Sequence, residues 1–185
     1  MLKRLLLSTA GLLATAAAIL PVGAQAASGT SCQVTGTMLE GDFTTMESDT
    51  WTGAPVNGFP GTIEIQTFTH PITLSGGISG TGFDQERAWF NARTFDFTSH
   101  DNVVFDPSTA YGPATVTCPD GTSKTGGLVV NFDATGNYIG NFFNAHFEIV
   151  GSSAGLDGTT GNGTVSGEPG VPGGNGPYTG SVQLR

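Results

Sequence analysis

Glycine and proline divide this chain into short runs that do not suit helices. The 185 residues include 29 glycines and 10 prolines. Between these breaks the apolar residues either cluster or alternate with polar ones, which is typical of β-strands. No long segment has the 3.6-residue period of an amphipathic helix. The sequence therefore predicts an all-β protein, with strands expected over residues 33–39, 61–68, 72–80, 87–97, 102–105, 114–118, 125–133, 138–150, 163–166 and 178–184.

Two segments are typical of hairpin turns. Asp120-Gly121 lies between two expected strands in CPDGTSKTGG, and residues 134–137 lie between two others in NFDATGNYIG. Asp, Asn and Gly are favoured in such turns because they tolerate the backbone conformations that a tight reversal requires. We expect a hairpin at each position.

The stretch NYIGNFFNAHFEIV has the clearest alternation in the chain. Successive residues of a strand point to opposite faces, so one face is apolar and the other is mixed. We expect the apolar face to be core. The mixed face is either exposed to solvent or, in a barrel, lines a wet interior pocket. The apolar set is Phe143, Ala145, Phe147 and Ile149, and the mixed set is Phe142, Asn144, His146 and Glu148.

Residues 1–26 are predicted to be a secretory signal peptide. Two basic residues precede an apolar run over residues 5–20, and residues 24–26 form a small-x-small cleavage site. A retained membrane anchor is the alternative, but the run is short for a span of about 20 residues. We expect an exported protein, periplasmic or extracellular, with residues 27–185 forming a single domain.

The chain is acidic, with 15 Asp and Glu against 6 Lys and Arg and a formal net charge of −9. Cleavage of the signal removes two of the basic residues and makes the net charge about −11. Such a balance repels nucleic acid and anionic membranes. We therefore expect no nucleic-acid partner and no membrane insertion after signal cleavage, and the oligomeric state stays open.

Two cysteines are present, Cys32 and Cys118. In an oxidising compartment an even pair predicts a disulfide. Two free thiols or a metal-binding pair are the alternatives, but zinc needs four ligands, and no CxxC or HxxxH spacing supplies them. We predict a disulfide that joins the first strand to the middle of the chain, and we expect no metal and no cofactor.

Four segments follow one another in the order of a known family of barrels. They are FTHPITLSGGISGTGFDQERAWF, GTSKTGGLVVNFDATGNYIGNFFNAHFEIV, GSSAGLDGTTGNGTVSG and GPYTGSVQLR. This order resembles the bacterial β-barrels that are similar to allene oxide cyclase and dirigent proteins. The resemblance implies an antiparallel β-barrel of about eight strands, whose interior can hold one small apolar ligand; a β-sandwich is the alternative fold. No catalytic motif of those families matches residue by residue, so no catalytic role is carried over.

The third of these segments, residues 151–167, is the most glycine-rich part of the chain. It does not precede a helix, so it has no helix N-terminus with which to cradle a phosphate. Strand signals follow it, and glycine permits tight turns and strong strand coiling where a barrel closes. We interpret the segment as part of the fold.

Chemistry inside a barrel requires an acid or base near its operating pKa and groups that hold a substrate oxygen. Polar residues on the expected strands are the candidates. For His146 and Glu148, which lie on the mixed face, ordinary solvent exposure is the simpler interpretation. The candidate catalytic residues are Arg93, Asp96, Tyr138, His146 and Glu148, and further polar residues on these runs are Glu64, His70 and Arg87.

Two functions from different classes follow. The first is a secreted barrel without catalysis, which binds a small apolar ligand or has an envelope or interaction role. The second is an isomerase or cyclase that acts on an apolar small molecule inside the barrel. A lumen lined by Phe and Val without a buried titratable pair favours the first, and a water-accessible pocket with converging Arg, Tyr and carboxylate groups favours the second.

Overall fold

The computed structural model describes residues 29–56, 59–169 and 174–185. The predicted signal peptide, residues 1–26, lies outside the described residues. No helix of the described part is long and apolar enough to cross a membrane.

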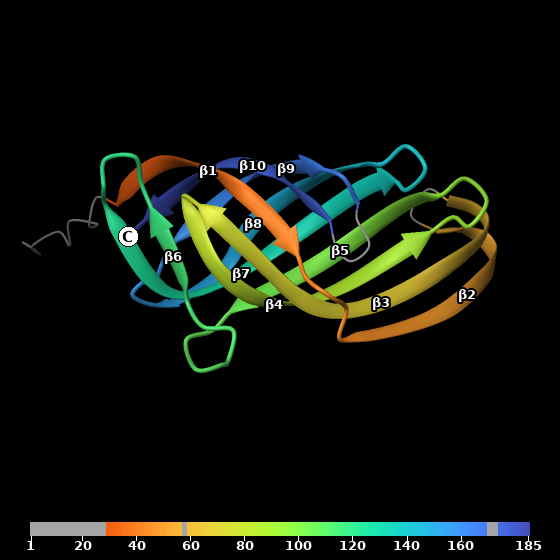
Figure 1. The fold of residues 1–185 in the computed structure, drawn as a ribbon, viewed down its shortest axis with the longest axis horizontal. Coiled ribbons are helices and arrows are strands. Elements are labelled where there is room, and N and C mark those ends of the chain that lie inside the picture. The colour runs from red at the N-terminus through yellow and green to blue at the C-terminus, as the bar shows by residue number, and fades with distance from the viewer. Residues whose placement is uncertain (1–28, 57–58, 170–173) are drawn as a thin grey trace, which may run out of the picture.

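The described chain forms ten strands, and all of their pairings are antiparallel (Figure 1). This confirms the predicted all-β antiparallel fold. The strands are β1 (Thr30–Glu40), β2 (Thr45–Val56), β3 (Phe59–Gly76), β4 (Ile78–Phe90), β5 (Asp96–Phe105), β6 (Ala114–Thr117), β7 (Ser123–Asn137), β8 (Phe142–Ala154), β9 (Thr160–Gly167) and β10 (Asn175–Leu184).

Eight of these strands pair in a closed ring. The order runs β3, β1, β10, β9, β8, β7, β5, β4, and the pairing of β4 with β3 closes it. The other two strands are attached to this ring: β2 pairs with β3, and β6 pairs with β4 and β7. Closure leaves the ring strands without free edges, as a barrel requires.

The interior of the ring is the hydrophobic core. Strand β8 shows the reason most simply, since Phe143, Ala145, Phe147 and Ile149 are buried while the residues between them are exposed. The predicted apolar face of this strand is therefore core, and its mixed face points to solvent. Other strands supply the same alternation, with buried residues that include Val34, Met38, Ile72, Leu74, Ile78, Val103, Phe105, Leu128, Val130, Phe132, Val165, Tyr178, Val182 and Leu184.

Strand β3 is long because it pairs with β2 along its first part and with β1 along its last part. Its first part pairs with β2 as far as the Thr45–Thr69 pair, and its last part pairs with β1 from Ile72 to Gly76. The chain leaves the ring at the end of β1 and crosses to β2 through residues 41–44. This crossing, with Phe43 at its centre, lies beside the interior site described below.

Cys32 on β1 and Cys118, directly after β6, form a disulfide. Their Cα atoms are 5.5 Å apart, although 86 positions separate them in the sequence. The predicted pairing is confirmed, including the link between the first strand and the middle of the chain. Cys118 is buried within the core cluster.

The structure corrects several predicted boundaries. The expected strand 87–97 is interrupted by a turn at residues 91–95, in which the Asn91 side chain accepts hydrogen bonds from the amides of Arg93 and Thr94. Residues 134–137 are the end of β7, and the reversal falls on residues 138–141. The hairpin around Asp120-Gly121 is confirmed by the β6–β7 pairing. Strand β2 was not predicted, because its sequence TMESDTWTGAPV lacks an apolar alternation.

Candidate functional site

Five titratable side chains lie together inside one end of the ring. They project from four strands at positions where the period of two also places core residues. His70 alternates with the buried Phe68 and Ile72 on β3, and Asp101 lies between the buried Ser99 and Val103 on β5. We call this group the acidic cluster; its members are Glu40 (β1), His70 (β3), Asp84 and Glu86 (β4) and Asp101 (β5).

The strand register brings the members of the acidic cluster side by side. His70 is directly opposite Asp84 across the β3–β4 ladder, and Glu86 is directly opposite Asp101 across the β4–β5 ladder. His70 Nε2 lies 3.0 Å from Asp84 Oδ2 and 3.5 Å from Glu86 Oε2. The side chains of His70 and Asp84 are 0% and 1% exposed. These contacts are therefore made inside the protein and away from bulk water.

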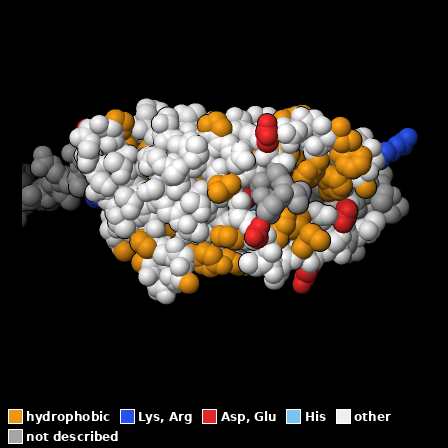
Figure 2. Space-filling view, viewed as in Figure 1, with side chains coloured by type: hydrophobic (Ala, Val, Ile, Leu, Met, Phe, Trp, Pro, Cys, Tyr) orange, Lys and Arg blue, Asp and Glu red, His pale blue; other side chains and the backbone are white. Residues whose placement is uncertain are grey.

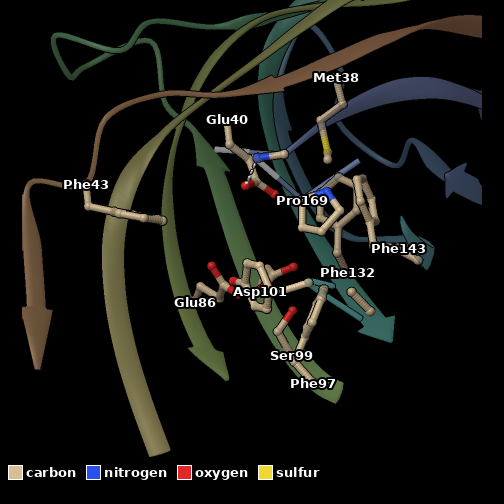
Figure 3. A pocket seen from close by; sticks show the side chains of 14 residues that line it. Met38, Glu40, Phe43, Glu86, Phe97, Ser99, Asp101, Phe132, Phe143 and Pro169 are labelled. Atoms are coloured by element: carbon tan, nitrogen blue, oxygen red, sulfur yellow. Dashed lines mark hydrogen bonds between the residues drawn. The ribbon is translucent and has the colours of Figure 1, made fainter. Parts of the chain in front are cut away.

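A cavity of about 30 Å³ adjoins the acidic cluster (Figure 3). Glu40 enters it from β1, and Glu86 and Asp101 enter it from β4 and β5. A volume of this size has room for one or two water molecules. Its remaining wall is mainly apolar and includes Met38, Phe43, Phe97, Phe132, Tyr138 and Phe143, and no Lys or Arg is among the described lining residues.

Burial and mutual repulsion keep protons on part of the acidic cluster. Burial, reinforced by Glu86, raises the pKa of Glu40 to about 7, although the Gly174 amide donates a hydrogen bond to its carboxylate. Burial is also the main cause of the raised pKa of Asp101, again with Glu86 adding to it. The pKa of Asp84 is raised by burial as well, and the contact with His70 opposes this. Ionising all four carboxyl groups in one interior costs a large free energy unless a cation compensates their charge.

His70 is the basic member of the cluster. Burial lowers its pKa, but the contacts with Asp84 and Glu86 outweigh this and raise the pKa to about 10. Phe43 makes a T-shaped contact with the imidazole, with ring centroids 5.1 Å apart. Phe43 also stacks on Phe68, with ring centroids 4.6 Å apart. His70 is thus held in a fixed place by packing as well as by charge.

Several atoms of the cluster have no hydrogen-bond partner among the described residues. His70 Nδ1, Asp84 Oδ1 and Asp101 Oδ1 are buried and belong to this group. Buried polar atoms are usually paired, so an unpaired set at one place indicates a position that receives a further group. His70, Asp84 and Glu86 also offer three ligand atoms within 4.8 Å of one another, which is a geometry that can hold a metal ion.

Aromatic side chains form a rim beside the cavity. We call Phe90, Phe95, Phe97 and Tyr138 the aromatic rim. The centroid of the Tyr138 ring lies 5.5 Å from that of Phe90 and 5.0 Å from that of Phe97. The ring centroids of Phe95 and Phe90 are 5.9 Å apart. Hydrophobic side chains gather on the surface at the end of the molecule where the β4–β5 and β7–β8 turns lie, on the right in Figures 1 and 2. Phe95 and Tyr138, in those turns, are 38% and 39% exposed. The aromatic rim therefore links the surface to the interior cavity.

Four of the five candidate residues proposed from the sequence do not line this cavity. His146 and Glu148 lie on the exposed face of β8, and Arg93 lies exposed in the turn between β4 and β5. Asp96 begins β5, where hydrogen bonds from Asn137 and Thr94 lower its pKa. Of the five candidates only Tyr138 lines the cavity, and burial, with Glu86 and Glu40 adding to it, raises its pKa to about 12.

Sequence reasoning missed the four carboxylates of the cluster. Asp84 and Glu86 are two residues apart and share the interior face of β4 with Gly82 and Ala88. The outward face of the same strand carries Phe83 and Trp89, so hydrophobicity alone assigns the two faces incorrectly. His70 has a clearer signal, because it alternates with buried apolar residues.

Comparison with known proteins gives little further information. No family model matches the chain, and no curated protein matches it. Among solved structures, the chain is similar to a protein of unknown function from the DUF3224 family of Shewanella oneidensis MR-1. The two chains are 15% identical, the match covers 84% of this chain and 98% of the other, and the TM-score is 0.48.

Proposed function

We propose that this protein binds a small, mainly apolar molecule at the acidic end of its interior, and that the ligand carries a basic or hydrogen-bond-donating group. The observation that supports this proposal is the joining of the aromatic rim to a cavity into which Glu40, Glu86 and Asp101 project. Ligand sites are typically apolar with a few convergent polar groups, and this arrangement has both parts.

The charge of the cavity selects the polar end of the ligand. The described lining residues include three carboxyl groups and no Lys or Arg. A protonated amine would gain ion pairs with these groups and would also be attracted to aromatic faces such as those of Tyr138 and Phe97. A carboxylate would be repelled. We therefore expect a cationic or neutral donor group to enter first and the apolar body to lie against the aromatic rim.

The size of the cavity requires side chains at its mouth to move. A volume of about 30 Å³ does not hold an organic molecule. Phe43 and Tyr138 are 36% and 39% exposed and both line the cavity. Side-chain rearrangements of this kind are common on binding, and the strands that carry the carboxylates need not move.

An isomerase or cyclase acting on such a ligand is the second candidate function. Glu40 favours it, because a carboxyl group with a pKa of about 7 both donates and accepts protons near neutral pH. Tyr138 lines the same cavity and can hold a substrate oxygen. The binding function needs only the shape and charge of the cavity, whereas catalysis also needs turnover of the bound molecule.

The proposal also includes the location of the protein and its family relationship. The signal pattern of residues 1–26 supports export to the periplasm or cell exterior, and the Cys32–Cys118 disulfide is compatible with an oxidising compartment. A relationship to the allene oxide cyclase-like and dirigent-like barrels is supported by the glycine and alternation patterns of the sequence. An envelope or interaction role without a ligand is the outcome if the binding experiment fails.

The test uses three probes that share one aromatic body: phenethylamine, phenethyl alcohol and phenylacetate. Each is titrated by calorimetry into the disulfide-bonded mature protein after treatment with EDTA. We expect the amine to bind most tightly and phenylacetate not to bind, and we expect Glu40→Gln to weaken amine binding. The matched control is Glu148→Gln, which removes an exposed carboxylate on β8.

Two results would contradict the proposal. One is equal binding of all three probes, and the other is an equal loss of amine binding in the Glu40→Gln and Glu148→Gln variants. The catalytic alternative is tested separately, by following any bound probe or extracted natural ligand for chemical change during incubation.

A further inference from the structure

His70, Asp84 and Glu86 form a compact set of three possible ligands inside the ring. We propose that this set binds one divalent transition-metal ion, with Zn²⁺ as the ion that fits it best. The metal set shares Glu86 and the adjoining cavity with the proposed organic-ligand site, but the proposal predicts binding of the ion alone, without any organic ligand.

Two of the three separations between the ligand atoms are those found around a metal ion, and the third is at most 4.8 Å. His70 Nε2 is 3.0 Å from Asp84 Oδ2 and 3.5 Å from Glu86 Oε2, and all three ligand atoms lie within 4.8 Å of one another. Zinc binds nitrogen and oxygen at roughly 2.0–2.2 Å, which puts neighbouring ligands about 3.0–3.5 Å apart. An ion can therefore enter with small side-chain adjustments.

The backbone holds these three side chains in place. His70 and Asp84 are a directly opposed pair on β3 and β4, and Glu86 follows Asp84 by two residues and so points to the same face. Both strands belong to the closed ring. Ligands on rigid strands bind an ion without an ordering cost, which favours a specific site.

The Asp84 carboxylate gives independent support. Asp84 is 0% exposed, and its Oδ1 has no hydrogen-bond partner of good geometry among the described residues, although the Asn102 amide lies near enough to lower the pKa of the group. A cation beside this oxygen would satisfy the carboxylate that burial has deprived of water.

Charge and ligand type select the metal. The ion would displace the proton that His70 otherwise holds, and the neutral imidazole and two carboxylates would then balance its charge of +2. The carboxyl groups of Glu40 and Asp101 lie close by. Calcium and magnesium prefer sites made only of oxygen, whereas an imidazole with carboxylates suits zinc and neighbouring transition metals. Three protein ligands leave a fourth position for water, and Glu86 borders the cavity of about 30 Å³ that has room for it.

The test titrates Zn²⁺ into tag-free, disulfide-bonded, EDTA-treated protein. The chain contains 3 histidines, and the other two, His100 and His146, are exposed on the outer face. The double variant His100→Asn/His146→Asn therefore keeps only His70. We expect one ion to bind both the wild type and the double variant with the same affinity. In the double variant the single imidazole NMR signal should shift as one equivalent is added.

A second variant tests the carboxylate. Glu86→Gln changes a side chain that is 14% exposed, so the fold should tolerate it better than a change at Asp84. We expect it to weaken Zn²⁺ binding at least about tenfold, while Glu148→Gln leaves binding unchanged. Circular dichroism of each variant checks its fold, and if Glu86→Gln does not fold, the His70 signal of the double variant decides. The proposal is overturned if the wild type binds no ion or if the double variant loses binding.

Discussion

The hydroxyl of Tyr178 on β10 makes two hydrogen bonds with the backbone of Ile78 at the start of β4. It accepts one from the Ile78 amide at 2.6 Å and donates one to the Ile78 carbonyl at 2.8 Å. The start of β4 lies beside β1, since the Gly77 amide donates a hydrogen bond to the Thr35 carbonyl, and the Tyr178 hydroxyl reaches it by passing over Gly36 of β1. Tyr178 is 4% exposed, and its side chain satisfies two buried backbone groups that lie outside the sheet ladder.

We therefore predict that Tyr178→Phe lowers the free energy of unfolding by about 1–3 kcal/mol. The aromatic ring remains, but the amide and the carbonyl of Ile78 each lose a buried partner. Urea denaturation measures the change. Tyr111→Phe is the matched control, because within the described residues its hydroxyl makes no hydrogen bond beside the ring contact with Phe83. Equal stability of the Tyr178 and Tyr111 variants would show that the contact between Tyr178 and Ile78 does not contribute.

The disulfide should contribute more than any single side-chain contact. It joins positions 86 residues apart, and in the chain-entropy model a loop of that length stabilises the folded state by about 4–5 kcal/mol. We predict a loss of this order in the double variant Cys32→Ala/Cys118→Ala, measured by denaturation against the oxidised wild type. Wild-type protein under reducing conditions should lose a similar amount. A loss below about 1 kcal/mol in both would contradict the prediction.

Glu40 predicts a pH dependence of stability. Its pKa rises from an ordinary value of 4.5 to about 7 on folding, mainly by burial. The folded state therefore binds this proton more tightly than the unfolded state. The resulting stability is fully present below pH 4.5, and it is lost as the pH rises from 4.5 through about 7, with a total on the order of 3 kcal/mol.

Denaturation of the EDTA-treated protein at about pH 5 and pH 8 tests this. We expect Glu40→Gln to reduce the difference between the two pH values by the part that Glu40 contributes, because an amide does not ionise and its oxygen still accepts the Gly174 amide. Asp84, Asp101 and His70, whose pKa values are also raised, remain in the variant and act in the same direction, so a pH dependence persists. If the variant keeps the full difference, another group of the cluster is responsible.

The fold was more predictable from the sequence than the site. Strand β8 was assigned to the correct faces because Phe143, Ala145, Phe147 and Ile149 alternate with Asn144, His146 and Glu148. The Asp120-Gly121 hairpin was predicted because Asp and Gly tolerate the backbone conformations that a tight turn requires. Both signals are local, and each lies within a dozen residues of the chain.

The acidic cluster could not be found in the same way. Its members come from β1, β3, β4 and β5, and only the pairing register places Glu86 opposite Asp101 and His70 opposite Asp84. The pairing register follows from which face of a strand is buried. On β4 the buried face cannot be identified from hydrophobicity, because the apolar Phe83 and Trp89 point outward. A site assembled from non-local pairing leaves no local motif.

The glycine-rich segment owes part of its composition to packing inside the ring. Gly163 on β9 and Gly180 on β10 are directly paired, and the ring of Phe147 on β8 lies over both. A Cβ atom on Gly163 would lie 2.2 Å from the carbonyl oxygen of Thr179 and 2.5 Å from the Phe147 ring. On Gly180 it would lie 2.6 Å from the same ring. An aromatic ring thus covers two backbones that have no side chains of their own.

We predict that Gly163→Ala lowers the free energy of unfolding by about 1–3 kcal/mol, the usual cost of overpacking a core. The matched control is Gly151→Ala in the same segment, where the nearest atoms to a new Cβ are 3.3 Å away and belong to the Val129 side chain. Thermal unfolding of the two variants gives the comparison. Because the Val129 side chain can yield and the Thr179 backbone cannot, Gly163→Ala should be the less stable of the two. Equal stability would show that β9 and β10 can separate without cost, and the packing explanation for this glycine would then be wrong.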